Sequence, residues 1–436
     1  MPLKIFYMTF GCKVNQYETQ NIAEKFAADG HAAVKNISEC DVCIINSCTV
    51  TAQSDTKCRH FIGRVKRENP NCVIVLCGCY PQAFPDKASQ LHECDIICGN
   101  KNKSKIPEMV YEFISERKKL LSIEKHKLHD SFEAMSNSFS DDKTRAYLKI
   151  QDGCDLYCTY CIIPYARGHI RSKSLTKITD ETLSMVNAGH KEIILTGINL
   201  CCYGRDFGDG TRLIDAIEAA CSLDADYRVR LGSIEPEMLS DKDIQRMSRL
   251  EKLCPQFHLS LQSGCDKILK LMGRRYNCGE YRTICGKLRN AFPDCAITTD
   301  IMVGFPGETE KDFAETAEFV KEIAFASAHI FPYSRRSGTK ADKMQGQIDR
   351  HTKSLRADRL AGVCKEMQLE YNRSLVGNVF DVLFEKESAS EYHQGHIPQY
   401  VVVRVPRKNE RSLWREKRKV KITYAETDFC IGEIID

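Results

Sequence analysis

Three cysteines stand close together near residue 155. Cys154, Cys158 and Cys161 form the pattern C-x₃-C-x₂-C directly after a segment that reads as a strand. Three thiolates on one short loop can hold three irons of a [4Fe–4S] cluster and leave the fourth iron without a protein ligand. That open iron can bind the amino and carboxylate groups of a small molecule. The alternatives are a zinc site, which usually completes four ligands from spaced C-x₂-C pairs, or three cysteines packed in a core.

A second set of cysteines is spread over the first eighty residues. Cys12, Cys48 and Cys79 each lie just past the C-terminal end of a predicted strand. In a parallel sheet those ends converge on one edge, which is the usual place for a ligand site. Gly11 and Gly78 would let the backbone approach a bulky cluster closely. The sequence therefore predicts that these three distant thiols meet at one site.

Other cysteines in the total of 23 have less informative positions. The pair Cys40-x₂-Cys43 has the spacing of a redox motif, but Cys43 lies in or beside a hydrophobic strand. In a long chain without an export signal, a high cysteine count does not by itself predict disulfides. We interpret most of the remaining cysteines as core residues, and we prefer Cys79 to Cys77 as a ligand because Cys77 ends its strand. The cysteines interpreted in this way include Cys77, Cys94, Cys98, Cys201 and Cys202.

The elements that must position the second set alternate between strand and helix. Strands are predicted at Lys4–Phe10, Val42–Asn46 and Cys72–Cys77, with helices at Glu18–Ala28 and Ala52–Glu68. This alternation predicts an α/β domain with an open parallel sheet over residues 1–115. The charged, weakly patterned stretch at 116–142 is interpreted as a linker.

A second series of strands and helices occupies residues 143–370. Segments between its strands, such as Asp180–Asn187 and Asp312–Ile323, have helical spacing. Six parallel strands, each followed by a helix, predict a partial (β/α)₆ barrel whose site lies at the strand ends. The predicted strands are Ala146–Ile150, Glu192–Thr196, Tyr227–Leu231, Phe257–Leu261, Ala296–Met302 and Ser327–Phe331.

The last part of the chain, residues 371–436, changes character. Short alternating strands at Val379–Phe384, Gln399–Val405, Lys419–Tyr424 and Cys430–Ile435 predict a small all-β module. Basic residues concentrate there, and such a patch can hold phosphates in a salt-dependent way. Trp414, the only tryptophan, could stack on a base or fill the core of the module. The basic residues are Arg404, Arg407, Lys408, Arg411, Arg415, Lys417, Arg418, Lys419 and Lys421.

The bulk composition limits the class of protein. The 436 residues are 42% hydrophobic and 28% charged, which is ordinary for a soluble globular protein. No stretch has the apolar length of a membrane helix, and the first residues do not resemble a signal peptide. We therefore expect a cytoplasmic protein without a membrane partner. The net charge of +4 is mild, so contact with nucleic acid would depend on local basic patches.

The segment from Asp152 to Arg167, with aromatic Tyr160 before its last cysteine, resembles the cluster-binding segment of the radical S-adenosylmethionine (SAM) superfamily. Its part from Cys154 to Cys161 is called the radical loop. The resemblance implies a [4Fe–4S] cluster and SAM, with reductive cleavage of SAM to a 5′-deoxyadenosyl radical. It also implies a reducing partner such as flavodoxin or ferredoxin. In such enzymes the cofactor performs the difficult chemistry, while the protein supplies position and excludes water.

Three motifs near the second set of cysteines resemble a narrower group. The patterns G-C-x-x-N, N-x-C-x-V and G-C-Y-x-Q, followed by the radical loop, are similar to those of the methylthiotransferase family of radical enzymes. The resemblance covers nearly the whole chain and implies a C-terminal module of the TRAM type. It implies a second [4Fe–4S] cluster on Cys12, Cys48 and Cys79, whose open iron is thought to hold the sulfur. A C–H bond becomes C–S–CH₃, with one SAM as methyl donor and another as radical source; the sulfur donor is not identified.

The resemblance also indicates a substrate. Gly11-Cys-Lys-Val-Asn-Gln-Tyr17 is closer to the branch that modifies N6-threonylcarbamoyladenosine beside the tRNA anticodon than to the isopentenyladenosine branch. The target base must leave its stack to reach the clusters. The alternatives are an isopentenyladenosine tRNA substrate, a ribosomal-protein aspartate, or a non-catalytic iron–sulfur protein that binds RNA or senses redox state. The candidate RNA-binding residues are Arg167, Arg171, Arg335 and Arg336, which could contact the anticodon loop, and Arg407, Lys408, Arg411 and Trp414 of the terminal module.

Contacts to SAM are expected at the ends of the barrel strands. By resemblance, Thr196 and Gly197 occupy the region that contacts the methionine amino group, and Gly304 would let the adenine approach. Each of these residues could instead be a helix cap or a turn. The sequence departs from common family patterns at Cys201-Cys202, Cys265 and Gly273. The candidate SAM contacts are Tyr160, Thr196, Gly197, Glu235, Gln262 and Gly304.

Overall fold

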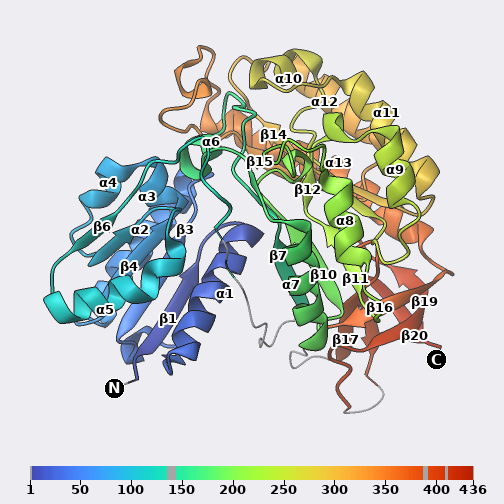
Figure 1. Ribbon diagram of the computed structural model, residues 1–436. Coiled ribbons are helices and arrows are strands. Elements are labelled where there is room, and N and C mark those ends of the chain that lie inside the picture. Colours follow the sequence, from blue (N-terminus) through green and yellow to red (C-terminus); the bar gives the residue numbers. More distant parts are fainter. Residues whose placement is uncertain (1, 134, 136–143, 386–390, 408–410, 436) are drawn as a thin grey trace.

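The computed structural model describes residues 2–133, 135, 144–385, 391–407 and 411–435, which form three parts along the chain (Figure 1). The first part is a six-stranded sheet in the order β2-β1-β3-β4-β5-β6, and every neighbouring pair is parallel. Strands β3 and β4 are buried along their whole length, as expected of a parallel sheet covered on both faces. The strands are β1 (Lys4–Thr9), β2 (Ala32–Ala33), β3 (Val42–Ser47), β4 (Val73–Gly78), β5 (Ile96–Cys98) and β6 (Leu120–Ser122).

Helices cover both faces of this sheet. On one face, α1 (Lys13–Ala28) and α5 (Ile106–Glu116) share a hydrophobic cluster with β1, β3, β4 and β5. On the other face lie α2 (Ala52–Glu68), α3 (Cys79–Ala83) and α4 (Pro85–Ser89). The predicted open parallel α/β domain is therefore confirmed.

The sequence predicted the bounds of α2 correctly and the start of α1 incorrectly. Helix α2 has the predicted bounds, because Thr51 Oγ1 accepts a hydrogen bond from the Ser54 amide at 3.2 Å at its start and the chain turns at Asn69 before a proline. Helix α1 begins five residues earlier than predicted, because Cys12 is its N-terminal cap residue. The first cysteine of the second set therefore lies directly at a helix N-terminus.

The segment interpreted as a linker contributes to this sheet. Leu120–Ser122 forms β6 and pairs with β5, so the sheet extends beyond residue 115. The short strands β2, β5 and β6 were not predicted, because two or three residues carry too little alternation to be recognised in a sequence.

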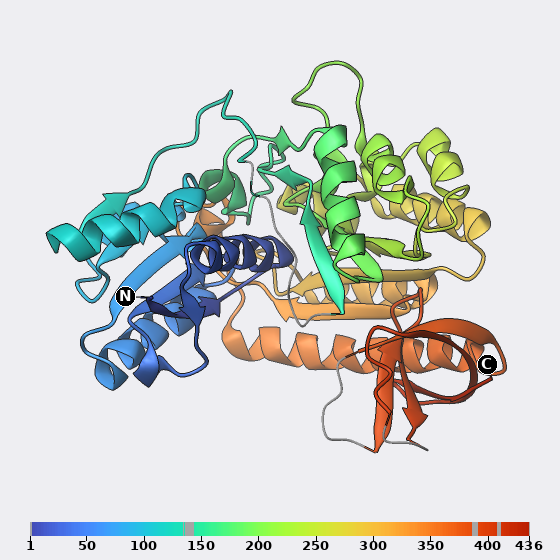
Figure 2. The same ribbon diagram turned by 60° about the horizontal axis from the view of Figure 1, so that its bottom comes forward.

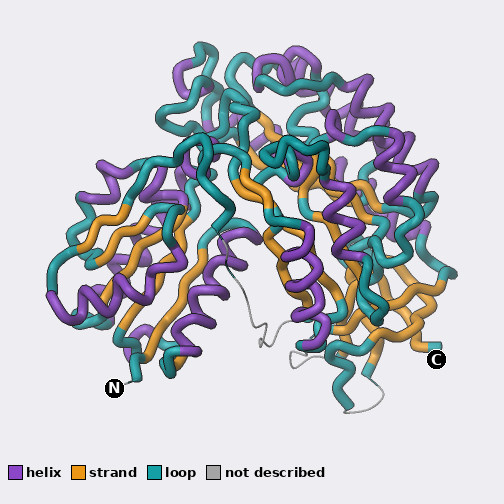
Figure 3. Tube along the Cα trace, in the orientation of Figure 1, coloured by secondary structure: helices purple, strands orange, loops and turns teal. Residues whose placement is uncertain are grey.

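The second part is an open barrel of parallel strands (Figure 3). One sheet has the order β11-β10-β7 and the other has the order β12-β13-β14-β15; only Gly232 separates β11 from β12. Strands β7 and β15 are the free edges, which agrees with the predicted partial (β/α)₆ barrel. The strands are β7 (Arg145–Lys149), β10 (Glu192–Thr196), β11 (Arg228–Leu231), β12 (Ser233–Ile234), β13 (Gln256–Leu259), β14 (Ala296–Val303) and β15 (Ser327–Pro332).

The barrel helices lie on its outside and share its large core. The last of them, α13, runs along β15 toward the C-terminal part and crosses residue 370, where the sequence predicts a domain boundary (Figure 2). Asp349 caps it by accepting a hydrogen bond from the Thr352 amide at 2.9 Å. The helices are α7 (Leu175–Asn187), α8 (Leu213–Cys221), α9 (Asp241–Met247), α10 (Asp266–Met272), α11 (Cys278–Ala291), α12 (Glu310–Ile323) and α13 (Arg350–Ser374).

The third part is a small closed β-barrel in the order β16-β17-β18-β20-β19, as predicted for an all-β module. Its core includes Leu413 but not Trp414, so the interpretation of Trp414 as a core residue of the module is wrong. Strand β17 was not predicted. The strands are β16 (Val379–Phe384), β17 (Tyr392–His396), β18 (Val402–Pro406), β19 (Lys417–Ala425) and β20 (Cys430–Ile434). Among the described residues, no helix has both the length and the apolar character needed to cross a membrane.

Candidate iron–sulfur site

The radical loop lies between two short strands that pair with each other, β8 (Gln151–Asp152) and β9 (Arg171–Ser172). The Cys154 amide donates to the Gly168 carbonyl at 3.0 Å and the Cys161 amide donates to the Cys158 carbonyl at 3.0 Å. Gly153 has φ +76°, and a Cβ atom there would lie 1.9 Å from the His169 carbonyl oxygen, so the loop closes only with glycine at this position. A fixed backbone thus carries all three cysteines of the loop.

N–H groups from distant segments point at these thiols. Asn199 Nδ2 donates to Cys154 Sγ at 3.7 Å, and Arg274 Nη1 donates to Cys158 Sγ at 3.4 Å. Burial, followed by the charges of Cys158 and Cys154, raises the pKa of Cys161 to about 12. When a metal group binds these cysteines as thiolates, the thiol protons are released. The N–H donors then stabilise the anionic sulfurs.

The second set of cysteines meets at the C-terminal edge of the first sheet, as predicted. Cys12 follows β1, Cys48 follows β3 and Cys79 follows β4. A Cβ atom on Gly11, whose φ is +108°, would lie 2.5 Å from Cys48 Cβ. Burial, followed by the charge of Cys79, raises the pKa of Cys48 to about 12, and the charge of Cys12 also contributes. The three thiols are therefore close enough to interact electrostatically.

The asparagines of the first two motifs fasten these loops together. Asn15 Nδ2 donates to the Phe10 carbonyl at 2.9 Å and to the Ser47 carbonyl at 3.0 Å, which joins the segments that carry Cys12 and Cys48. Asn46 Nδ2 donates to the Asn15 carbonyl at 3.0 Å. Both asparagines belong to motifs that are visible in the sequence, but their hydrogen-bond partners are visible only in the structure.

The glutamine of the third motif positions the segment beside Cys79. Gln82 Oε1 accepts from the Asn100 amide at 2.8 Å. Asn100 Nδ2 then donates to Cys79 Sγ at 3.5 Å and to the Ala166 carbonyl at 2.7 Å. Because Ala166 belongs to α6 (Ile163–Arg167), which follows the radical loop directly, this amide connects the two cysteine sites.

Arg167 makes the strongest connection between the two sites. Its side chain is fully buried, and its Nε donates to Cys79 Sγ at 3.4 Å. Its Nη1 donates to Glu18 Oε1 at 2.5 Å, and its Nη2 donates to Asn15 Oδ1 at 2.5 Å. The prediction that Arg167 contacts RNA is wrong, because no part of this side chain reaches the surface.

A buried charge network surrounds Arg167. Glu18 also pairs with Lys103 at 2.5 Å and with Lys149 at 2.8 Å, while Asp152 pairs with Lys149 at 2.6 Å. These neighbouring cations hold the pKa of Glu18 well below its usual range, although burial acts to raise it. With Arg167 and Arg171, cations outnumber carboxylates four to two in the described part of this network. The surplus positive charge beside Cys79 suits an anionic group, such as a cluster held by three thiolates.

A cavity of about 200 Å³, the triad cavity, lies between the two sites. Val50 and Thr51, which follow Cys48, form one side of it. Tyr160 and Cys161 of the radical loop form another. The remaining lining residues come from the barrel strand ends and from the segments that follow them: Ile162, Ile163, Gln262, Asp300, Met302, Phe331, Pro332, Tyr333 and Ser334.

Comparison with known proteins identifies this arrangement. Residues 148–320 match the radical SAM superfamily, and residues 4–99 match a family described as uncharacterized protein family UPF0004. The threonylcarbamoyladenosine tRNA methylthiotransferase of Thermotoga maritima is 39% identical over 394 residues, which are 90% of this chain and 89% of that protein. The chain belongs to the radical SAM methylthiotransferase family.

Two further comparisons place it more broadly. A tRNA-2-methylthio-N(6)-dimethylallyladenosine synthase of Acetivibrio thermocellus is 34% identical over 386 residues, covering 86% of this chain and 79% of that protein. Among solved structures, the radical SAM methyltransferase TsrM of Kitasatospora setae has a TM-score of 0.58 over 90% of this chain and 81% of that one. At 11% identity this likeness concerns the fold alone.

Membership of the methylthiotransferase family implies a [4Fe–4S] cluster and SAM, and the radical loop fits both. Cys154, Cys158 and Cys161 supply three partly exposed thiols with N–H donors beside two of them. Three thiols leave one iron for SAM, whereas a zinc site would require a fourth ligand. The chain is therefore a radical SAM enzyme, as predicted from the sequence.

The candidate SAM contacts of this methylthiotransferase fall into two groups. Tyr160 and Gln262 line the triad cavity, and Gln262 Oε1 is buried without a hydrogen-bond partner in the described structure. Glu235 pairs with Arg274, whose other nitrogen donates to Cys158. Arg274 was missed by the sequence analysis, since no motif surrounds it.

The other three candidates lie in closely packed parts of the barrel, and their roles toward SAM stay predictions. Thr196 is buried, and a Cβ atom on Gly197 would lie 2.9 Å from Gln151 Oε1. A Cβ atom on Gly304, whose φ is +71°, would lie 2.3 Å from Lys353 Cγ of α13. Glycine at 304 thus lets α13 approach the barrel, and its predicted role toward the adenine remains a prediction.

Two further arginines predicted to contact RNA are buried, and that prediction is wrong for both. Arg171 Nη2 donates to the Arg167 carbonyl at 2.9 Å, behind the radical loop. Arg336 Nη2 donates to Thr49 Oγ1 at 2.6 Å and to Asp55 Oδ2 at 2.8 Å, which fastens the barrel mouth to the loop after Cys48. Arg336 thus joins two domains, whereas the partners of Arg171 belong to the barrel domain. Loss of water at such buried positions favours paired charges over free ones.

The remaining RNA candidates lie nearer the surface. Arg335 is exposed and pairs with Asp342 at 2.6 Å, and Arg411 is exposed and pairs with Glu416 at 2.9 Å. Arg407 is half-buried, while Lys408 lies outside the described residues. Trp414 Nε1 donates to Thr144 Oγ1 at 3.1 Å, so the tryptophan contacts the segment before β7.

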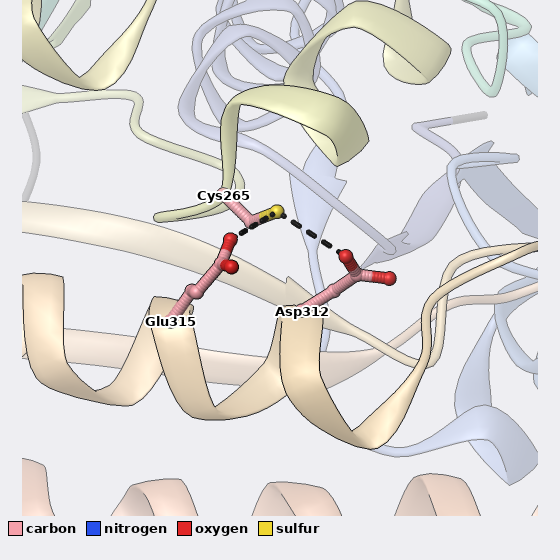
Figure 4. A group of neighbouring side chains, drawn as sticks. All are labelled: Cys265, Asp312 and Glu315. Carbon is pink, nitrogen blue, oxygen red and sulfur yellow. Dashed lines mark hydrogen bonds between the residues drawn. The ribbon is translucent and has the colours of Figure 1, made fainter.

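The other cysteines pack as core residues or bond to their surroundings. Cys40 Sγ lies 3.3 Å from Cys72 Sγ rather than pairing with Cys43, so the redox spacing has no structural counterpart. Figure 4 shows Cys265 between two carboxylates of α12, with its Sγ 3.1 Å from Glu315 Oε2 and 3.7 Å from Asp312 Oδ1. Lys267 pairs with Asp312 at 2.6 Å. Cys265, one of the departures from the family pattern, does not line the triad cavity.

Proposed function

We propose that this enzyme converts N6-threonylcarbamoyladenosine next to the anticodon of tRNA to its 2-methylthio derivative. The observation that carries the proposal is the triad cavity, which has residues beside Cys48 on one side and residues of the radical loop on another. A base in this cavity would lie beside Cys161 and beside the segment that follows Cys48. The threonylcarbamoyladenosine tRNA methylthiotransferase of Thermotoga maritima supports the choice of substrate.

We infer that Cys12, Cys48 and Cys79 hold a second [4Fe–4S] cluster. Three thiols from three strand ends, an arginine and an asparagine that donate to Cys79, and a surplus of buried positive charge support this assignment. The cluster would offer the sulfur for insertion into the C–H bond. One SAM would supply the radical, and a second SAM would supply the methyl group. Helix α1 directs its N-terminus at Cys12, which also favours an anionic group.

The chain's own residues would position these groups and exclude water. Gly11 and Gly153 allow the two loops to close, and Arg167 fixes α6 against the segment that carries Cys79. Gln262 lines the triad cavity, and its buried oxygen has no hydrogen-bond partner within the described residues. The reduction requires an electron donor, for which we propose a flavodoxin or a ferredoxin.

We propose that the C-terminal barrel binds the tRNA. Its exposed cations include Arg411, Lys419 and Lys421, and Lys421 has no ion pair within the described residues. Arg411 shares Glu416 as an ion-pair partner with Arg418, so one carboxylate balances two of the cations of this barrel. Binding through the exposed cations would weaken as salt concentration rises.

The test is anaerobic turnover of the reconstituted full chain with SAM, a strong reductant and defined tRNAs. One tRNA carries threonylcarbamoyladenosine and the other carries dimethylallyladenosine. Mass spectrometry of the nucleosides should find the methylthio group on the threonylcarbamoyl form. Product only on the dimethylallyl form would assign the chain to the other branch, and 5′-deoxyadenosine without any methylthio product on either tRNA would contradict the tRNA assignment.

A further inference from the structure

A second cavity, of about 430 Å³, lies inside the barrel and is called the lumen cavity. All three parts of the molecule line it, since Lys13 comes from α1, His258 and His329 come from barrel strands, and Gln399 comes from the C-terminal barrel. Asp300 lines both this cavity and the triad cavity. The two cavities are therefore neighbours that meet at the Asp300 side chain.

The lumen cavity contains a lysine that the protein leaves unneutralised. Within the described residues, Lys13 makes no hydrogen bond and no ion pair, although it lies partly buried beside Cys12. Arg230 adds positive charge behind it, with its guanidinium paired to Glu192 at 2.9 Å and lying 4.6 Å from the centre of the Tyr400 ring. A partly buried ammonium without a partner favours an anionic ligand.

The acidic groups of the cavity do not satisfy this lysine. Asp300 pairs with His258 at 3.3 Å, and His329 lies with its ring centre 6.5 Å from that of His258. Asp428 is exposed at the lining of the cavity. The described lining thus keeps one free cation facing the space.

A glutamine with an unpartnered hydrogen-bond acceptor lines the same space. Gln399 is 6% exposed, and its buried Oε1 has no hydrogen-bond partner in the described structure. Buried side-chain oxygens are rarely left unsatisfied, so this one points to a ligand that supplies an N–H or O–H group. The lumen cavity therefore offers sites for both an anion and a donor.

We propose that the lumen cavity binds the threonylcarbamoyl substituent of the substrate adenosine, with its carboxylate at Lys13 and one of its N–H or O–H groups at Gln399. This inference rests on the proposed function and names the residues that determine its specificity. A dimethylallyl substituent has neither a carboxylate nor a donor, so it would leave Lys13 and Gln399 unpaired. Because Lys13 adjoins Cys12, recognition of the substituent would also hold the base beside the second cluster.

The test measures the affinity of the reconstituted full chain for two anticodon stem–loop RNAs by fluorescence anisotropy. One RNA carries threonylcarbamoyladenosine and the other carries unmodified adenosine at the same position. Wild-type protein should prefer the modified RNA. Lys13→Met should reduce this preference by about tenfold or more, because a charge-assisted hydrogen bond is lost, while Lys13→Arg retains most of it.

Two other variants make the result specific. Gln399→Leu, which lies in another domain from the cluster cysteines, should also reduce the preference, by a smaller factor. Lys57→Met removes the same charge from an exposed lysine of α2 outside both cavities, and should lower affinity for the two RNAs equally or not at all. Iron content of each preparation shows whether the cluster sites are intact, and Gln399→Leu decides the question if Lys13→Met loses iron.

The outcomes separate this inference from the proposed function. If wild-type protein prefers the modified RNA and both Lys13→Met and Gln399→Leu keep that preference, the lumen cavity is not the recognition site. If wild-type protein shows no preference and methylthiolates only dimethylallyladenosine, the proposed function itself fails. A preference that falls with either variant and not with Lys57→Met supports the assignment.

Discussion

The two cysteine triads use opposite ways of bringing three thiols together. Cys154, Cys158 and Cys161 lie on one loop whose backbone is closed by β8 and β9. Cys12, Cys48 and Cys79 lie on three loops that meet only because β1, β3 and β4 are parallel neighbours. The first triad therefore depends mainly on local backbone conformation, whereas the second depends on the sheet and on the side chains that fasten its loops. The comparison predicts that the two sites can be disabled separately.

The largest effect is expected from removing one ligand of either triad. Cys158→Ala should abolish formation of 5′-deoxyadenosine and of product, because SAM cleavage requires the radical cluster. Cys79→Ala should abolish the methylthio product and reduce bound iron from about eight to about four per chain, yet retain cleavage of SAM. Iron analysis and chromatography of 5′-deoxyadenosine measure both. Full product from Cys79→Ala would show that the second triad holds no cluster needed for the reaction.

Substitution of the glycines beside the triads should also disable one site at a time. Gly11→Ala places a Cβ atom 2.5 Å from Cys48 Cβ and should lower iron at the second site while SAM cleavage continues. Gly153→Ala places one 1.9 Å from the His169 carbonyl oxygen and should lower SAM cleavage strongly. Iron content and 5′-deoxyadenosine yield are the measurements.

Gly30→Ala is the matched control for these glycine variants. Gly30 has φ +84° in the same domain as Gly11, but nothing lies within 4 Å of the added Cβ atom. It should cost only about 1 kcal/mol of stability for the left-handed backbone and leave both sites intact. Equal iron loss in Gly30→Ala and Gly11→Ala would mean that backbone strain, rather than the contact with Cys48, disables the site.

Arg167 should be far more important to stability than an arginine at the barrel mouth. Arg167→Gln leaves Glu18 and Asp152 with fewer partners in a buried network, and loss of one partner in such a network costs about 3–5 kcal/mol. Arg335→Gln removes an exposed pair with Asp342 and should cost about 0–1 kcal/mol. Denaturant unfolding of the two variants gives the comparison.

A second measurement shows whether Arg167 influences the second cluster through Cys79 or only stabilises the fold. If Arg167 acts on the second cluster through Cys79, the reduction potential of that cluster should shift in Arg167→Lys, which keeps the charge but loses the guanidinium geometry. An unchanged potential in a folded Arg167→Lys protein would limit Arg167 to a structural role.

The smallest effect is expected in the pH dependence of stability that comes from His126, which lies in the segment between the first sheet and the barrel. Burial, followed by the charge of Arg171, lowers the pKa of His126 from 6.5 to about 4. The unfolded chain then binds a proton that the folded chain does not, so the contribution of His126 makes stability fall as pH falls from about 6.5 to about 4. Unfolding measured at several pH values should show a shallower fall for His126→Gln. Parallel pH profiles for the two proteins would contradict this.

Much of the site could be predicted because its signals are local. The thiol spacing of the radical loop lies within eight residues, from Cys154 to Cys161, and the ends of β1, β3 and β4 follow from short hydrophobic runs before Cys12, Cys48 and Cys79. Strands of three residues, such as β5 and β6, escaped prediction because they have no periodicity to detect. The motif amides Asn15, Asn46 and Gln82 were visible, but their partners were not.

The sequence by itself determined the family, the six candidate ligands and the alternation of elements, because these depend on residue type and short spacing. Only the tertiary structure decided which charged residues are buried. Arg167 and Arg336 join two domains, and Arg171 is paired within the barrel domain, so none of the three lies free at the surface for RNA. It also decided that Lys13 and Gln399 share one cavity. The physical reason is that the state of a charge depends on neighbours supplied by distant segments, and no local pattern encodes those neighbours.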